Sequence, residues 1–272
     1  MDLTGNLRKM RTSLDQGKAQ YELKLFNILE AGDSVAMNAL VGKEIRLEWT
    51  SNIHCVVTGK KIKKTFREGM SYEAFRSSPT AVESIIRPEL SRIHEGIALR
   101  DKEWEEKHHN QPHYVYLSLT SGVKVGVTRT VNIPSRWIDQ GAVEAILLAE
   151  TPYRQLAGLI EVDLKDFMAD KTNWRAMLKN EYDASIDLLD KKEEILEMIP
   201  PQYEDYISDE DDVTTIEYPV LEYPVKVTSV KLDKLNVLEG KLLGIKGQYL
   251  LFDNGRVINI RSHAGYEVRI SD

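Results

Sequence analysis

Three side chains in the middle of the chain have types that could bind or cleave a phosphate ester. They are Tyr116 in HYVYLSL, Arg136 in SRWIDQ, and Glu161 inside an apolar run. An arginine can stabilise phosphate charge, because its guanidinium is planar and permanently protonated. A carboxylate can hold a divalent ion that polarises a phosphoryl oxygen, and a tyrosine hydroxyl can orient or deprotonate water. Together they predict phosphoester chemistry.

Local patterns predict the elements that would carry these three side chains. The run from His113 to Arg129 predicts two strands joined by a turn at Ser121 and Gly122. A short helix that stops near Gly141, a buried strand and an amphipathic helix should follow. In chain order, we expect strands over 114–119 and 123–128, a helix over 135–142, a strand over 142–150 and a helix over 151–170.

Each candidate also has a purely structural interpretation. A tyrosine in a strand is often there for packing, and Gly126 could mark a bulge. Arg136, in the first turn of its helix, could be a surface residue. Glu161 is harder to explain in this way, because it is flanked by leucine and isoleucine and a buried carboxylate needs a partner.

The order of these motifs resembles the GIY-YIG nuclease domain, over residues 114 to about 179. Tyr116 matches the tyrosine of the first strand, and Gly126 matches the glycine of the second motif. Arg136 matches the helical arginine, and Glu161 matches the metal-binding glutamate. Lys124 stands where the family has its second tyrosine.

The resemblance implies a metal-dependent endonuclease with Tyr116, Arg136 and Glu161 as catalytic residues. It implies Mg²⁺ or Mn²⁺ at Glu161. The residues expected to bind substrate are Lys124, Gly126, Arg129 and Asn173. For the segment around Asn173, a capping role for Thr172 is the structural alternative.

Nearly the whole chain also resembles an uncharacterised bacterial family with a domain of unknown function. The resemblance rests on IHCVVTGKKIKKTF, SIIRPELSRIHEGIA, HYVYLSLTSGVKVGVTR, RWIDQGA, DKTNWRAMLKN and LLGIKGQYLLFDNG. Relatives carry a cysteine-rich, zinc-ribbon-like segment, of which this chain keeps Cys55. The expected cysteine positions hold Ser71, Ala74, Ser84 and Ser91. A tetrahedral zinc site needs four ligands, so we expect no structural zinc here.

Two further clusters could suggest ligands. The basic run Lys60, Lys61, Lys63, Lys64 and Arg67 is short, which favours a solvated hairpin edge over a nucleic-acid patch. The histidines of EKHHNQPH form no helical i, i+4 pair around a catalytic glutamate. We therefore expect exposed histidines at the end of a polar helix.

These patterns predict an α+β protein of three consecutive parts. Residues 1–112 should form an N-terminal β-rich region with the degenerate zinc-ribbon-like segment. Residues 113–200 should form a GIY-YIG-like hairpin and sheet with helices. Residues 213–272, with their DNG-type turns, should form a small β-barrel or sandwich.

The composition limits the possible partners. Among 272 residues, 42% are hydrophobic and 29% are charged, as in ordinary globular proteins. No run predicts a membrane span and the start lacks a signal peptide, so we expect a cytoplasmic protein. The net charge is −7, but residues 181–212 carry −11, which leaves about +4 elsewhere. Nucleic acid thus remains a possible partner. The alternative is a catalytically inactive module that binds nucleic acid or protein.

Overall fold

The computed structural model describes residues 1–165 and 173–272, and its chain divides into two compact units. Unit 1 contains residues 1–78, 138–141 and 217–272. Unit 2 contains residues 79–137 and 142–216. The fold is mixed α+β with a strand-rich N-terminal region, as predicted.

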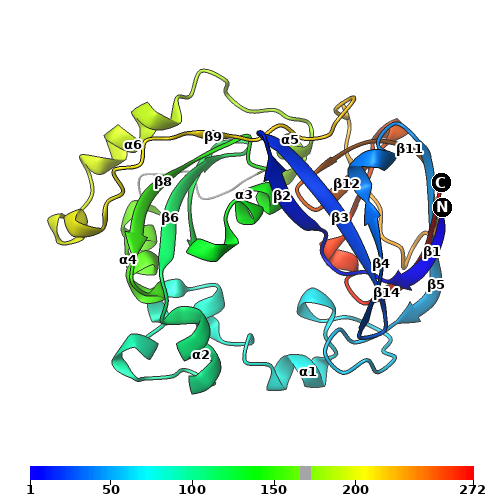
Figure 1. Ribbon diagram of the computed structural model, residues 1–272, viewed down its shortest axis with the longest axis horizontal. Helices are drawn as coiled ribbons and strands as arrows, with labels where there is room; N and C mark the ends of the chain where they lie inside the picture. The colour runs from blue at the N-terminus through cyan, green and yellow to red at the C-terminus, as the bar shows by residue number, and fades with distance from the viewer. Residues whose placement is uncertain (166–172) are drawn as a thin grey trace. The chain divides into compact units, whose positions relative to one another are not determined.

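Unit 1 is built on one ten-stranded sheet, in which strands from both ends of the chain are paired (Figure 1). The strand order is β10-β13-β12-β11-β5-β14-β1-β3-β2, with β4 paired to β3. The strands are β1 (Asp2–Asn6), β2 (Arg11–Asp15), β3 (Lys18–Asn27), β4 (Glu30–Ala36), β5 (Glu44–Ile53), β10 (Thr228–Ser229), β11 (Val237–Lys246), β12 (Tyr249–Phe252), β13 (Arg256–Asn259) and β14 (Tyr266–Ser271). Helix α1 (Tyr72–Ser77) also belongs to this unit.

The pairing of the C-terminal strands corrects the expected separate barrel or sandwich over 213–272. Strand β11 pairs with β5, and β14 pairs with both β1 and β5. Buried side chains alternate along these strands, as at Leu47, Val268 and Ile270, so they share one core with the N-terminal strands. The divisions of the chain thus differ from the three consecutive parts expected from the sequence.

Unit 2 contains a four-stranded sheet in the order β7-β6-β8-β9, with helices packed against it. The strands are β6 (His113–Leu119), β7 (Val123–Arg129), β8 (Glu144–Thr151) and β9 (Thr214–Thr215). The helices that begin in this unit are α2 (Lys102–His109), α3 (Ser135–Gln140), α4 (Arg154–Lys165), α5 (Trp174–Leu178) and α6 (Leu188–Leu196).

The core of unit 2 is built from buried residues that alternate along β6 and recur every four positions along α4. On β6, the alternate residues Val115, Leu117 and Leu119 are buried. On α4, Leu156 and Ile160 recur four residues apart and pack into the same cluster. The predicted hairpin, the short helix before Gly141 and the buried strand are confirmed. Residues 166–170 of the helix expected over 151–170 lie outside the described residues.

No helix within residues 1–165 and 173–272 is both long enough and apolar enough to cross a lipid bilayer.

Candidate functional site

The β6–β7 hairpin places Tyr116 directly opposite Gly126. The Tyr116 side chain is fully buried, and its ring meets Trp137 of α3 nearly edge-on, with 6.0 Å between ring centroids. A Cβ atom on Gly126 would lie 2.6 Å from the Tyr116 hydroxyl oxygen. Gly126 therefore makes room for the Tyr116 ring, a role that neither the bulge nor the phosphate interpretation had anticipated.

A polar cavity of about 250 Å³ lies in unit 2, and we call it the arginine cavity. Helix α2, strand β7 and the beginnings of α3 and α4 contribute its walls. Among the residues that the structure describes, three arginines and two histidines line it, and no carboxylate does. The lining residues are Ile85, Trp104, His108, His109, Val127, Thr128, Arg129, Asn132, Arg136 and Arg154.

Arg154 is held in place by backbone carbonyl groups. Its Nε donates to the carbonyl oxygen of Ser84 at 2.9 Å, and its Nη2 donates to that of Ile85 at 3.1 Å. A guanidinium has five N–H groups in a fixed plane, so these two bonds fix its orientation and leave further donors. Arg154 is therefore oriented, at the start of α4, to donate hydrogen bonds to an anion.

The three arginines share one electrostatic environment. Burial lowers the pKa of Arg154 to about 10; Glu161 opposes this effect, and Arg136 and Arg129 add to it. Neither Arg129 nor Arg136 forms an ion pair with any residue in the described part of the chain. Positive charges gathered without a lining carboxylate create a potential that attracts an anion.

His109 lines this cavity and carries a buried polar atom without a hydrogen-bond partner. Only 2% of the residue is exposed, and its Nδ1 lies 3.1 Å from Ser91 Oγ. Its Nε2 is buried and has no hydrogen-bond partner. Burial, followed by Arg154, lowers the pKa of His109 to about 3, so the ring is neutral at pH 7. An orphaned buried nitrogen carries a free-energy cost that a ligand atom would remove.

A second set of ionisable groups adjoins the cavity. Burial lowers the pKa of Lys124 to about 8, Arg136 lowers it further, and Glu161 opposes the shift. Burial raises the pKa of Glu161, and Lys165, Arg154 and Arg136 offset part of that rise. Three expected site residues, Lys124, Arg136 and Glu161, therefore lie within electrostatic reach of one another.

Glu161 has a second carboxylate in its surroundings. Glu89, in the 3-10 turn η4 (Pro88–Leu90), contributes to the raised pKa of Glu161. Its Oε1 accepts from Arg87 Nε at 3.0 Å, while its buried Oε2 has no partner. Among the described residues, no group of three or more His, Cys, Asp or Glu is placed to hold a metal ion. Mg²⁺ is bound in proteins by one or two carboxylates together with waters.

Asn173, expected in the substrate site, instead caps a helix. Its Oδ1 accepts from the backbone N–H groups of Arg175 at 3.1 Å and Ala176 at 3.2 Å, at the start of α5. Its own N–H donates to Ser121 Oγ at 2.9 Å. The side chain is exposed, and it does not line the arginine cavity. Thr172, the alternative cap, lies outside the described residues.

The sequence interpretation overlooked two residues that line the arginine cavity, Arg154 and His109. Arg154 carried no motif, and its only signal was a cation in the first turn of an otherwise apolar helix. The expectation of exposed histidines after α2 is wrong for His109 and His113, which are both buried. Their burial comes from contacts between segments, which the local sequence does not encode.

The segment of unit 1 around Cys55, expected to resemble a zinc ribbon, is held by packing. The Cys55 thiol is buried with Met70 and Ala74, and Sγ accepts from the Ser71 N–H at 3.2 Å. Burial alone would raise the pKa of Cys55, but hydrogen bonds from Thr58 and Ser71 bring it down to about 7. The expected absence of zinc stays a prediction.

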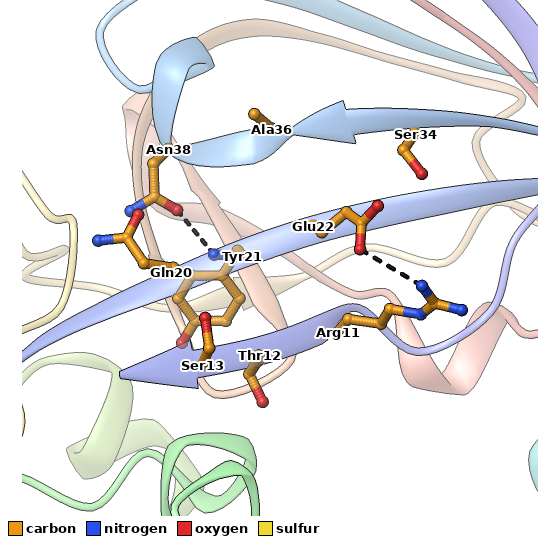
Figure 2. Close-up of a pocket in the computed structure, with 9 residues that line it drawn as sticks. All are labelled: Arg11, Thr12, Ser13, Gln20, Tyr21, Glu22, Ser34, Ala36 and Asn38. Atoms are coloured by element: carbon orange, nitrogen blue, oxygen red, sulfur yellow. Dashed lines mark hydrogen bonds and ion pairs between the residues drawn. The ribbon is translucent and has the colours of Figure 1, made fainter. Parts of the chain in front are cut away.

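Another hollow, of about 590 Å³, lies over β2, β3 and β4 in unit 1 (Figure 2). Its two charged residues neutralise each other, with Arg11 Nη1 3.6 Å from Glu22 Oε2. The Asn38 amide is also occupied, because its Oδ1 accepts from the Tyr21 N–H at 2.9 Å. The charged residues of this hollow and its Asn38 amide therefore already have partners within unit 1.

Comparison with known proteins gives one match. A family model described as "Protein of unknown function (DUF2797)" matches residues 42–268. No curated protein and no solved structure matches the chain.

Proposed function

The chain belongs to the DUF2797 family of proteins of unknown function, and for this member we propose that unit 2 binds nucleic acid through a backbone phosphate in the arginine cavity. One observation carries the proposal: Arg129, Arg136 and Arg154 converge on one cavity, and no carboxylate in residues 1–165 or 173–272 lines it. Arginine suits this ligand, because its planar fork matches the oxygens of a phosphate.

His109 and Trp104 support a nucleotide as the source of that phosphate. A neutral imidazole with a buried, unpartnered Nε2 can donate one further hydrogen bond to a phosphate oxygen when Nδ1 accepts from Ser91. Trp104 is half-buried at the cavity wall, and one face of its ring is stacked on His108 with 4.4 Å between ring centroids. Phosphate donors together with an aromatic ring are the recurrent elements of single-strand recognition.

Equilibrium binding of a labelled, 5′-phosphorylated oligonucleotide tests this function. The double variant Arg129→Gln, Arg136→Gln should weaken binding at least tenfold in low salt and reduce the salt dependence of the affinity. The matched control is Lys102→Gln, Lys107→Gln, which removes the same charge from exposed positions of α2 outside the cavity. Equal losses in the two double variants would refute the cavity as the binding site.

Metal-dependent phosphodiester hydrolysis is a second candidate, favoured by the half-buried Glu161 beside cations and Glu89. The GIY-YIG resemblance of residues 114–179 supports the same activity. Glu161 and Glu89 would hold Mg²⁺ or Mn²⁺, and the ion would stabilise charge on the leaving group. Lys124, in place of the second tyrosine, has a pKa of about 8 because it is buried. A fraction of its amine is therefore neutral at pH 7 and able to accept a proton from water.

Cleavage assays separate this activity from binding alone. Single-stranded, duplex and branched DNA and RNA would be incubated with the protein and Mg²⁺ or Mn²⁺. Hydrolysis should disappear in Glu161→Gln, and in Lys124→Met it should lose its rise toward pH 8. If the wild-type protein cleaves none of these substrates while the arginine variants still lose binding, unit 2 is a binding module.

A further inference from the structure

A basic segment of unit 1 forms a surface that the arginine cavity does not include. It follows β5 and contains four exposed lysines and two exposed aromatic rings. We call it the lysine–aromatic surface, and it comprises Lys60, Lys61, Lys63, Lys64, Phe66 and Tyr72. The sequence alone had favoured a solvated hairpin edge here, because it could not show where the aromatic side chains lie.

Two carboxylates lie beside the four lysines of this surface: Glu73 lines a hollow with Lys60 and Lys61, and Glu267 interacts electrostatically with Lys61. None of its four lysines forms an ion pair with a residue that the structure describes, whereas Arg46 and Arg269 of unit 1 do. The nearby acid Glu68 is already paired with Arg261. Exposed cations without ion-pair partners create a positive local potential that attracts an anion.

The aromatic rings lie among these charges. Phe66 and Tyr72 are 37% and 53% exposed, and their ring centroids are 5.1 Å apart. Lys64 Nζ lies 5.8 Å from the Phe66 centroid, and Arg76 Cζ lies 6.0 Å from that of Tyr72. Exposed rings with cations over their faces are the elements on which nucleobases stack while phosphates are neutralised.

The backbone beneath the rings is fixed. Phe66 and Met70 exchange two backbone hydrogen bonds of 2.7 and 2.9 Å. Gly69 between them has φ +89°, and a Cβ atom there would lie 2.6 Å from the carbonyl oxygen of Ala264. The loop is therefore docked tightly on the rest of unit 1, and its rings are presented on a rigid base.

A hollow of about 620 Å³ adjoins Lys60, Lys61 and Tyr72, within the range of about 300–1,000 Å³ typical of small-ligand sites. We propose that the lysine–aromatic surface is a second nucleic-acid site that binds a single strand, with phosphates at the lysines and bases on Tyr72 and Phe66. Bases are available for stacking only when they are unpaired, so a single strand fits better than a duplex. The site uses no residue of the arginine cavity and goes beyond the function proposed above.

The test is fluorescence anisotropy with a 12-nucleotide single strand that lacks terminal phosphates, over a range of salt concentrations and with the full chain. The lysine variant K60Q/K61Q/K63Q/K64Q should weaken binding at least tenfold. It should also lower the slope of log affinity against log salt by about 3, since each phosphate contact contributes about 0.7. Tyr72→Ala should weaken binding about tenfold, and Tyr72→Phe should restore it.

The control K226Q/K231Q/K234Q/K241Q removes the same charge from exposed lysines elsewhere in unit 1 and should bind as wild type. An equal loss in this control, or no loss in Tyr72→Ala, would overturn the proposal. Equal affinity for a duplex, or tighter binding of polyglutamate, would overturn it as well. If Arg129→Gln, Arg136→Gln leaves this binding intact while the lysine variant loses it, the lysine–aromatic surface binds independently of the arginine cavity.

Discussion

At the scale of single residues, the lowered pKa of Lys124 is the most informative feature. Burial lowers its pKa from 10.5 to about 8. Because the folded pKa lies below the unfolded one, keeping the ammonium charged costs stability. That cost is fully present below pH 8 and disappears as the pH rises toward 10.5. A residue kept at such a cost is a candidate for function.

Lys124→Met should therefore raise the free energy of unfolding by about 1–3 kcal/mol at pH 7, because it removes a buried charge. The gain should shrink at pH 10, where the wild-type amine is neutral. Urea unfolding at both pH values measures the difference, with the exposed Lys102→Met as control. A gain of the same size at both pH values would contradict the buried-ammonium account.

His113 makes the opposite prediction, in acid. Burial lowers its pKa to about 4, so the unfolded chain takes up a proton near pH 6.5 while the folded chain does not. Stability should fall by about 1.4 kcal/mol per pH unit for this group between about pH 6 and pH 4. In His113→Gln, the pH dependence of unfolding should be shallower by that amount. An unchanged slope would show that His113 titrates equally in both states.

At the scale of elements, the contact between α4 and η4 positions the arginine cavity. Gly158 of α4 lies against the backbone of Glu89, and a Cβ atom there would be 2.3 Å from that residue's nitrogen. The segment before η4 supplies the Ser84 and Ile85 carbonyls that orient Arg154. The close approach of the α4 and η4 backbones therefore sets the position of Arg154.

Gly158→Ala should lower the free energy of unfolding by about 1–3 kcal/mol, because the new methyl group meets backbone atoms and forces the elements apart. It should also weaken oligonucleotide binding more than its stability loss explains, through displacement of Arg154. The control is Gly122→Ala, where a Cβ atom meets nothing within 4 Å. Thermal unfolding and anisotropy on both variants measure the effect; equal behaviour of the two would contradict it.

Local elements were predictable, whereas the cavity was not. The hairpin follows from alternation and from the turn at Gly122, and the end of α3 follows from Gly141. Each of these signals lies within a few residues of the element that it predicts. Lys124, Arg136 and Glu161 were found through motif order. The cavity also needs His109 and Arg154, 45 positions apart, and only tertiary packing brings them together.

At the scale of the whole molecule, unit 1 is assembled from distant parts of the chain. Its sheet joins β5 to β11 and β1 to β14 (Figure 1). The N-terminal ammonium also forms an ion pair with Asp272. The DNG-type turns indicated the C-terminal strands but not the strands they pair with, because the residue pattern of a short strand does not specify its neighbour in the sheet.

Residues 213–272 expressed alone should therefore not form a native sheet, since β11 and β14 would lose their neighbours and expose unpaired edges. Circular dichroism and amide dispersion in NMR spectra measure this. Adding residues 1–78 in trans should restore structure. A fragment that folds cooperatively on its own would contradict the shared core.

The central claim is that unit 2 binds a nucleic-acid phosphate between three arginines. A crystal structure with the 5′-phosphorylated dinucleotide pTpT tests it most directly. We predict a phosphate within hydrogen-bond distance of Arg129, Arg136 and Arg154, with one oxygen on His109 Nε2. A dinucleotide bound elsewhere, with the arginine cavity holding only water, would contradict the claim.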